Sequence, residues 1–284
     1  LPWQMAARAT GATLKFIECE PDGSLDLEKV ESTVTDKTKI VAMTEVSNVL
    51  GRRYPIEEVS RIAHRHNAVM VVDGAQSTPH MPVDVKKLGA DFFAFSGHKI
   101  YGPMGIGILY GRRELLDAMP PFLSGGEMIE SVSRESAVYA EVPHKFEAGT
   151  VNAAGAAGLA AALRYVQNIG FENIMQAEHR LTAKAFDMMK DIKGVNIIGA
   201  ADAANHNGII TFTVDGVHPH DISEVLASDG VCVRAGHHCA QPLLRHLGLM
   251  STARASFAFY NTADDAEKFI DSLSTVRERM GYGK

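Results

Sequence analysis

Short apolar runs alternate with segments of helical periodicity along the first part of the chain. Runs rich in Val, Ile and Thr predict strands, whereas apolar residues spaced three or four positions apart predict helices. The predicted strands are 13–18, 38–46 and 69–75, and the predicted helices are 27–34 and 55–67. This alternation of strand and helix predicts a parallel sheet with crossover helices.

The pattern continues with a short helical piece at 83–88 and two further strands at 92–95 and 105–110. The segment 120–151 lacks strong periodicity, and we interpret it as a long functional excursion. Residues 152–163 are rich in Ala and Gly, which suits a flexible linker or the tightly packed start of a helix. We favour a helix that continues to about residue 175, because three apolar residues keep helical spacing: Leu159, Leu163 and Val166.

The remainder of the chain predicts a smaller unit of mixed strands and helices. Helices are expected at 178–190, 220–228, 241–247 and 263–280, and strands at 195–198, 209–214 and 231–234. We therefore expect an α/β fold with a mostly parallel sheet, plus a smaller α+β C-terminal domain. The expected boundary lies near residue 165, which gives a large domain at 1–165 with the linking helix and a small domain at 166–284.

Composition narrows the class of protein. The 284 residues are 46% hydrophobic and 22% charged, which is typical of a globular protein and excludes disordered, collagen-like and disulfide-scaffold classes. A net charge of −6 argues against nucleic-acid binding and membrane-surface binding, and no apolar run reaches the length of a membrane span. The odd set Cys19, Cys232 and Cys239 favours reduced thiols and a cytoplasmic location. Residues 2–12 predict a helix already under way, so we expect an amino-terminal portion before them.

Lys99 is the first candidate for chemistry. The strand at 92–95 ends near Gly97, which should deliver His98 and Lys99 into a tight loop at the carboxyl end of the strand. Open α/β sheets bind ligands at this end, and partial burial favours the unprotonated amine that Schiff-base chemistry needs. The alternative is a surface lysine that follows an ordinary turn.

A second group of polar residues follows the strand at 69–75. Asp73 ends the strand, and Gln76 and Ser77 come directly after it. A buried carboxylate needs a cationic partner, and a protonated pyridine nitrogen would be one. Pyridoxal 5′-phosphate requires a lysine and such an acid, whereas the alternative is that Asp73 and Gly74 only form a turn.

Cys239 is the candidate nucleophile. It follows His237 and His238 on a loop that also contains Arg234, and cationic neighbours stabilise a thiolate. The alternative, a small buried apolar residue, suits Cys19 and Cys232 better. A zinc site at this loop is disfavoured, because adjacent histidines rarely face one ion and no fourth ligand is evident.

Two further patterns give only weak indications of a functional site. The segment GPMGIG does not have the spacing of a dinucleotide-binding loop and leads into a strand, so we reject a nicotinamide site. His218 and His220 could contact an acceptor protein or a metal, but exposed loop residues and a helix start explain them as well.

Five motifs in order carry a family resemblance: VVDGAQS, FSGHKIYGPMGIGILYG, FEAGTVN, VRAGHHCAQP and RASFAFYN. The chain resembles the SufS-type cysteine desulfurases of the class V aminotransferase family, over essentially its whole length. The resemblance implies the fold of the fold-type I pyridoxal phosphate transferases. It also implies a homodimer.

The resemblance implies a role for each matching residue. Lys99 would form the Schiff base with the cofactor, Asp73 would pair with the pyridine nitrogen, and Gln76 would contact the phenolic oxygen. The implied phosphate contacts are Ser96 and His98, with Thr150 reaching the phosphate of the neighbouring subunit. Asn48 would contact cofactor and substrate, Arg254 would clamp the substrate carboxylate, Arg234 would be a second active-site arginine, and Cys239 would carry the persulfide.

The expected function is therefore a cysteine desulfurase. It would convert L-cysteine to L-alanine and pass the sulfur from Cys239 to an acceptor protein of the Suf system for iron–sulfur cluster assembly. Alternatives are a selenocysteine lyase, another class V aminotransferase, or a sulfur-transfer scaffold without a cofactor. In the family, a segment before residue 1 supplies a ring-stacking histidine and a phosphate loop, so we expect residues 1–284 alone to bind the cofactor poorly.

Overall fold

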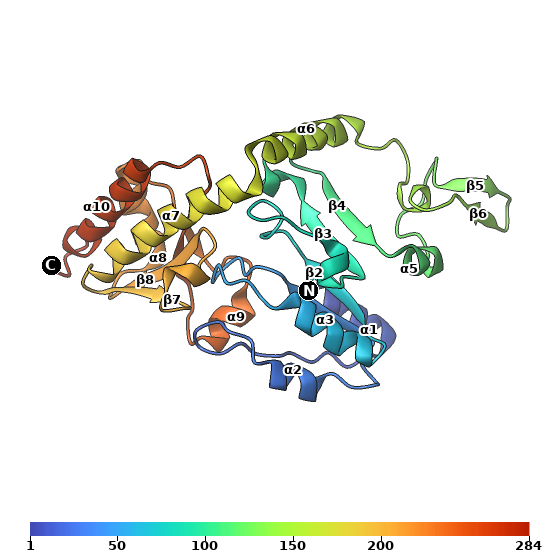
Figure 1. Cartoon of the computed structure of the whole chain (residues 1–284), viewed down its shortest axis with the longest axis horizontal. Helices are drawn as coiled ribbons and strands as arrows, with labels where there is room; N and C mark the ends of the chain where they lie inside the picture. Colours follow the sequence, from blue (N-terminus) through green and yellow to red (C-terminus); the bar gives the residue numbers. More distant parts are fainter. Residues whose placement is uncertain (284) are drawn as a thin grey trace.

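A computed structural model describes residues 1–283, in which the strands form two four-stranded sheets and one two-stranded sheet (Figure 1). The first sheet has the order β1–β2–β3–β4. Its strands are β1 (Ile40–Thr44), β2 (Val69–Asp73), β3 (Phe92–Ser96) and β4 (Gly107–Gly111). The pairs β1–β2 and β2–β3 are parallel and β3–β4 is antiparallel, which confirms the mostly parallel sheet.

Three helices pack on the first sheet. They are α2 (Leu27–Thr33), α3 (Ile56–Arg65) and α4 (Val85–Leu88), and their apolar residues share one buried cluster with Met70, Val72 and Phe93. Asp26 and Asp84 cap α2 and α4 by accepting backbone N–H bonds in the first turn. Helices α3 and α4 connect successive parallel strands, as the alternating pattern predicts, and α2 precedes β1.

The second sheet has the order β7–β8–β10–β9 and is antiparallel throughout. Its strands are β7 (Val195–Ile198), β8 (Ile209–Val214), β9 (Arg234–Gly236) and β10 (Thr252–Ser256). They share a core with three helices, namely α7 (Phe171–Lys190), α8 (Pro219–Ser228) and α10 (Ala263–Arg279). The short helix α9 (Gln241–His246) lies beneath the sheet, on the side of the first sheet (Figure 1).

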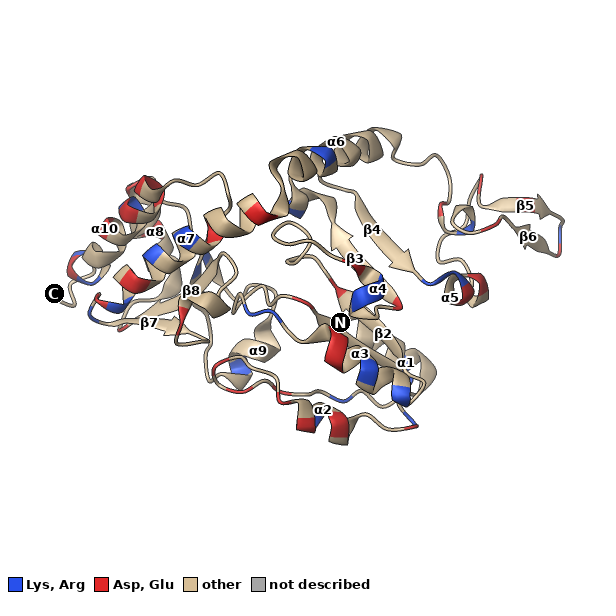
Figure 2. Ribbon diagram, in the orientation of Figure 1, with Lys and Arg blue, Asp and Glu red and all other residues tan. Residues whose placement is uncertain are grey.

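The helix after residue 152 is confirmed, but its end was predicted wrongly. The structure has α6 (Ala153–Ile169), a break at Gly170, and then α7. Gly170 has a φ of +85°, which glycine adopts without steric cost, and it caps the end of α6. Figure 2 shows that α6 carries almost no charge, whereas α7 carries both signs.

The segment 120–151 contains more regular structure than its sequence indicates. A hairpin of β5 (Ile129–Val132) and β6 (Ala137–Tyr139) projects from the molecule (Figure 1). It lies between α5 (Arg113–Ala118) and the 3-10 helix His144–Phe146. Most of its side chains are exposed, so no apolar alternation marks the strands.

Two other predicted elements need correction, and further elements were not predicted. Residues 13–18 are irregular and no strand pairs with them, although the helix before them is present as α1 (Pro2–Thr10). The strand predicted at 231–234 begins only at Arg234, and β10 was not predicted. A 3-10 helix at Ala203–Asn205 was also not predicted. Among residues 1–283, no helix has both the length and the apolar character needed to cross a membrane.

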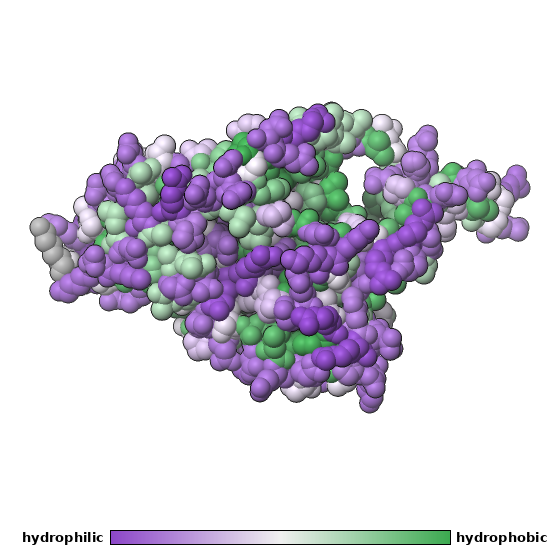
Figure 3. Space-filling model, in the orientation of Figure 1, coloured by the Kyte–Doolittle hydropathy of each residue, from purple (hydrophilic) through white to green (hydrophobic). Residues whose placement is uncertain are grey.

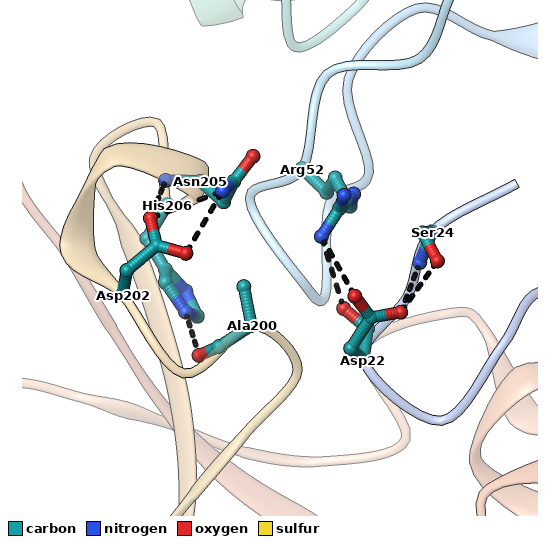
Figure 4. A network of polar contacts seen from close by, with 7 residues as sticks. All are labelled: Asp22, Ser24, Arg52, Ala200, Asp202, Asn205 and His206. Atoms are coloured by element: carbon teal, nitrogen blue, oxygen red, sulfur yellow. Dashed lines mark hydrogen bonds and ion pairs between the residues drawn. The ribbon is translucent and has the colours of Figure 1, made fainter.

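Backbone contacts join the two four-stranded sheets. The amide of Asn207, just before β8, donates to the carbonyl of Gly51 at 2.9 Å, and Gly51 follows β1. Figure 4 shows Arg52 bonded to Asp22 near this junction, and His206 bonded to Ala200 on the opposite side of it. The loop that carries Asn48 is therefore fixed between the two sheets.

Candidate active site

The carboxyl ends of β2 and β3 form the first half of the site. Asp73 ends β2 and pairs in register with Ala94 of β3, which ends two residues later at Ser96. His98 and Lys99 follow on a 3-10 helix, Gly97–Ile100, rather than in the tight loop that the sequence predicts. A methyl group on Gly97 would lie 3.0 Å from Ile106, so the close approach of these segments explains the glycine.

Lys99 is half-buried and His98 is exposed. Ile100, the next residue, is fully buried against Leu159 of α6 and anchors the short helix. Within residues 1–283, four side chains at this edge make no hydrogen bond or ion pair: Gln76, Ser96, His98 and Lys99. Their polar groups therefore remain available to a ligand.

Asp73 differs from its predicted environment. Its carboxylate is exposed and accepts a hydrogen bond from the amide of Ala75 at 2.9 Å, which is the contact of an ordinary Asx turn. The expectation of a buried carboxylate is thus wrong for this structure, in which Asp73 is the last residue of its strand and is exposed. Ser77, by contrast, is buried and donates to the carbonyl of Gly74.

The residues at this edge fit pyridoxal 5′-phosphate by their chemistry. They combine an amine, a carboxylate, an amide and hydroxyl and imidazole groups at the carboxyl ends of parallel strands. Their individual roles toward the cofactor stay predictions.

The second half of the site is the loop between β9 and α9. Cys239 is exposed, and Arg234 donates from Nη2 to its sulfur at 3.3 Å. His238 and Cys239 have φ values of 54° and 60°, which non-glycine residues rarely adopt. This backbone turns the thiol toward the arginine at the start of β9.

His238 is not the cation that the sequence indicates. Its ring is buried, and burial together with the charges of Arg254 and Arg234 lowers the pKa of His238 to about 4. The ring is therefore neutral at physiological pH. Among residues 1–283, Arg234 is the cation that the structure places in contact with Cys239.

Asn48 and Arg254 meet the cysteine loop. Arg254 donates from Nη1 to the carbonyl of Asn48 at 2.8 Å, and Asn48 donates from Nδ2 to the carbonyl of His238 at 2.6 Å. Arg254 lies on β10 directly opposite Arg234 on β9. Burial, and then the charge of Arg234, lowers the pKa of Arg254 below its usual value. Its Nε is buried without a partner in residues 1–283, which leaves a donor for an anionic ligand.

The two halves meet at β1. The amide of Glu45, the residue after β1, donates to the carbonyl of Asp73 at 2.9 Å, and Asn48 follows three residues later. The structure thus brings Asn48, Arg234, Arg254 and Cys239 together, and Asn48 belongs to the chain segment that leaves the first sheet beside Asp73. Thr150 is exposed before α6 and has no bond to any of these residues in the described chain.

Sequence reasoning missed Thr252, and it took His238 for a cation. His238 contacts Thr252 of β10, with 2.8 Å between Nε2 and Oγ1, and both residues are buried. Thr252 precedes Arg254 by two positions in a strand, so both side chains lie on the same face. The spacing of Thr252 and Arg254 was a usable signal, but β10 itself was not predicted.

The remaining candidate residues have structural explanations. His218 caps α8 by accepting from the amide of His220, so the two histidines mark a helix start. Cys232 is exposed, which corrects the expectation that it is a buried apolar residue. Cys19 is half-buried, and burial raises the pKa of its thiol. No group of three or more His, Cys, Asp or Glu residues in positions 1–283 is arranged to hold a metal ion.

Comparison with known proteins decides the family. The model of the family described as aminotransferase class V matches residues 1–269. The chain belongs to the class V aminotransferase family.

Similar class V proteins carry a more specific name. A protein of Halalkalibacterium halodurans named as a probable cysteine desulfurase is 49% identical over 99% of this chain and 69% of its own length. A cysteine desulfurase structure from Thermococcus onnurineus has 43% identity and a TM-score of 0.94, over 98% of this chain and 69% of that one. An Escherichia coli cysteine desulfurase in an S-sulfonic acid form has 38% identity and a TM-score of 0.93, with the same two coverages. These likenesses confirm the expected fold.

Proposed function

We propose that this class V family member is a cysteine desulfurase, with Cys239 as the residue that receives sulfur. The observation that carries the proposal is the exposed Cys239 thiol in contact with Arg234, 3.3 Å from the guanidinium nitrogen. A thiolate is the attacking form of cysteine, and a guanidinium in contact with the sulfur favours it. The names of the similar proteins support the same activity.

In this proposal, Arg254 binds the carboxylate of L-cysteine. Its Nη1 is held by the carbonyl of Asn48, and its buried Nε has no partner in the described chain, so the guanidinium is oriented before the substrate binds. A planar guanidinium matches the two oxygens of a carboxylate. Arg254 therefore fixes the amino acid beside the Cys239 loop.

We assign the unbonded side chains of Lys99, Gln76, Ser96 and His98 to the cofactor, together with the exposed carboxylate of Asp73. Pyridoxal 5′-phosphate, when bound, supplies an electron sink for cleavage of bonds next to the substrate amine. The half-buried Lys99 would accept and return the alpha proton of the substrate at its Nζ. Thr150, exposed on the surface, is proposed to contact the cofactor phosphate of a second subunit.

The overall reaction balances without another oxidant or reductant. The Cys239 thiolate attacks the sulfur of L-cysteine, an S–S bond forms, and the C–S bond of the substrate breaks. The carbon that loses sulfur takes up a proton, which gives L-alanine and a persulfide on Cys239. Because Cys239 is exposed, a thiol of an acceptor protein can take the outer sulfur, and we propose the Suf system and iron–sulfur cluster assembly as its destination.

We also propose that the chain forms a homodimer. Figure 3 shows hydrophobic surface beside α6, and Leu109 of β4 and Phe122 are 59% and 94% exposed. A second copy would cover such apolar residues and place Thr150 at the interface. Sedimentation should therefore give twice the monomer mass, and Leu109→Asp should shift the protein toward the monomer.

Two further assignments complete the proposal. We assign residues 1–165 to the cofactor domain and residues 166–284 to the domain that carries the cysteine loop, with the boundary inside the linking helix α6. The reduced thiol at Cys239 suits the cytoplasm, because an oxidising compartment would block it.

The decisive experiment is mass spectrometry of peptides after incubation with pyridoxal 5′-phosphate and L-cysteine. We expect the mass of one added sulfur on the Cys239 peptide, together with free alanine, both in small amounts because residues 1–284 alone should bind the cofactor poorly. Cys239→Ala should lose the added sulfur, whereas Cys232→Ser, at another exposed cysteine, should keep it on Cys239. Sulfur on Cys232, or alanine release at full rate by Cys239→Ala, would contradict the assignment.

Lys99 can be tested separately. Lys99→Ala should remove the visible absorbance of the covalently bound cofactor, and Lys86→Ala, on the exposed surface of α4, should retain it. Persistence of the absorbance in Lys99→Ala would show that another lysine binds the cofactor.

A further inference from the structure

The loop that carries Cys239 contains an unusual backbone. Two consecutive non-glycine residues, His238 and Cys239, have left-handed φ values. Histidine tolerates this conformation better than most residues, whereas cysteine has no such preference. Something outside the loop must therefore hold these two residues in place.

His238 provides contacts on both sides of the loop. Its carbonyl accepts from Asn48 at 2.6 Å, and its ring lies 2.8 Å from the hydroxyl of Thr252. Thr252 is fully buried and pairs with Gly236 in the β9–β10 ladder, so it is a fixed point. The residue next to the nucleophile is thereby tied both to the loop after β1 and to β10.

The ring of His238 does not act as a simple space-filling group. Only 1% of the residue is exposed, and its Nδ1 is buried without a partner in residues 1–283. An apolar side chain would fill the same space without an unsatisfied nitrogen, so filling alone would not favour histidine here. The feature that distinguishes the ring from an apolar filler is its bond to Thr252.

We propose that His238 is a positioning residue that, through Thr252 and Asn48, holds the Cys239 thiol against Arg234. The role of the Cys239 thiol in receiving sulfur rests on the proposed function, whereas the position of the thiol does not. His238 enters as a neutral group, because burial keeps its pKa low. The contact between Arg234 and Cys239 should then exist only while the bond between His238 and Thr252 exists.

The test is a double-mutant cycle on the full chain, with iodoacetamide as the probe of Cys239. Peptide mass spectrometry gives the alkylation rate of Cys239 separately from those of Cys19 and Cys232. Removal of the cation by Arg234→Gln should slow alkylation of Cys239 by about three- to tenfold. In the Thr252→Val background, which lacks only the hydroxyl, we expect Arg234→Gln to change the rate by less than about twofold.

Two controls define the outcome. Thr252→Ser restores a hydroxyl and should restore the full Arg234 effect, and His237→Ala, at the exposed neighbouring ring, should keep it. An equal Arg234 effect in Thr252→Val and in the native chain would overturn the proposal. Circular dichroism checks that each variant is folded. The test uses Thr252→Val and Thr252→Ser, which change little of the side-chain volume, so it requires no substitution of the buried His238.

The same data separate this inference from the proposed function. Alkylation needs neither cofactor nor substrate. If the coupling holds but L-cysteine leaves no sulfur on Cys239, the positioning role stands and the desulfurase assignment fails. If L-cysteine leaves sulfur on Cys239 but the coupling is absent, the desulfurase assignment stands and the positioning role of His238 fails.

Discussion

His238 and Cys239 adopt left-handed backbone conformations although neither is glycine. Each such residue costs about 1–3 kcal/mol, so the fold must stabilise them elsewhere. The bond of Asn48 to the His238 carbonyl and the ring contact with Thr252 are the visible sources. At the scale of single residues, the reactive thiol is thus a strained group held by buried neighbours.

The titration of His238 makes the stability depend on pH. Its pKa is about 4 in the folded protein and 6.5 in the unfolded chain, so the unfolded chain binds the proton more tightly. Stability from His238 is complete above pH 6.5 and falls as the pH drops toward 4. Between pH 7 and pH 5 the native chain should lose about 1–2 kcal/mol through this residue.

Urea unfolding at the two pH values measures this loss. His238→Gln cannot titrate, so its difference between pH 7 and pH 5 should be smaller than that of the native chain by about the same amount. Equal pH dependence in both proteins would mean that the folded pKa of His238 is not lowered.

At the scale of elements, helix ends decide what can be read from the sequence. The last helix, α10, begins with a capping box in which Thr262 accepts from the amide of Asp265 and Asp265 accepts from the amide of Thr262. This local signal accompanies a helix that was predicted almost to its ends. Strand β10, Thr252–Ser256, has no such signal, because two of its five residues are alanine and its stability comes from neighbours on both sides.

The capping box allows a prediction for α10. Thr262→Ala removes the acceptor for the Asp265 amide and should lower the free energy of unfolding by about 1 kcal/mol. Thr262→Ser keeps the hydroxyl and should cost only a few tenths of that. Thermal or urea unfolding of both variants checks the difference, and an equal loss would assign it to the methyl group of Thr262.

At the scale of the whole molecule, a polar pair with a buried carboxylate joins the first sheet to the helix that packs on the second. His80, after β2, lies 2.8 Å from Glu178 on α7, although 98 residues separate them in the chain. Glu178 is buried, and its second carboxylate oxygen has no partner in residues 1–283. Such a carboxylate depends on its single partner.

Loss of that partner should be costly. His80→Leu leaves the Glu178 carboxylate buried and unpaired, so we expect unfolding to become easier by about 3 kcal/mol. The double variant His80→Leu with Glu178→Leu should recover much of this loss. As a control, His66→Leu breaks the pair with the exposed Asp36 and should cost less than about 1 kcal/mol. Urea unfolding of the four proteins tests the comparison, and similar losses for His80→Leu and His66→Leu would contradict it.

Contacts between distant parts of the chain limit how much of the site the sequence can predict. Motifs predicted roles for Lys99, Arg234, Arg254 and Cys239, because each lies in a distinctive short segment. They could not show that Asn48 bonds His238 across 190 residues, or that His238 is buried and neutral rather than cationic. Burial and partners come from tertiary packing, which a local pattern does not contain.

The opposition of Arg234 and Arg254 across the β9–β10 ladder has a consequence for ligand binding. Two guanidinium groups on opposite positions of neighbouring strands repel each other, and this repulsion destabilises the ligand-free sheet. An anion that binds between them reduces this repulsion and also forms its own contacts with both groups. Small carboxylates should therefore raise the melting temperature, and Arg234→Gln should reduce the increase.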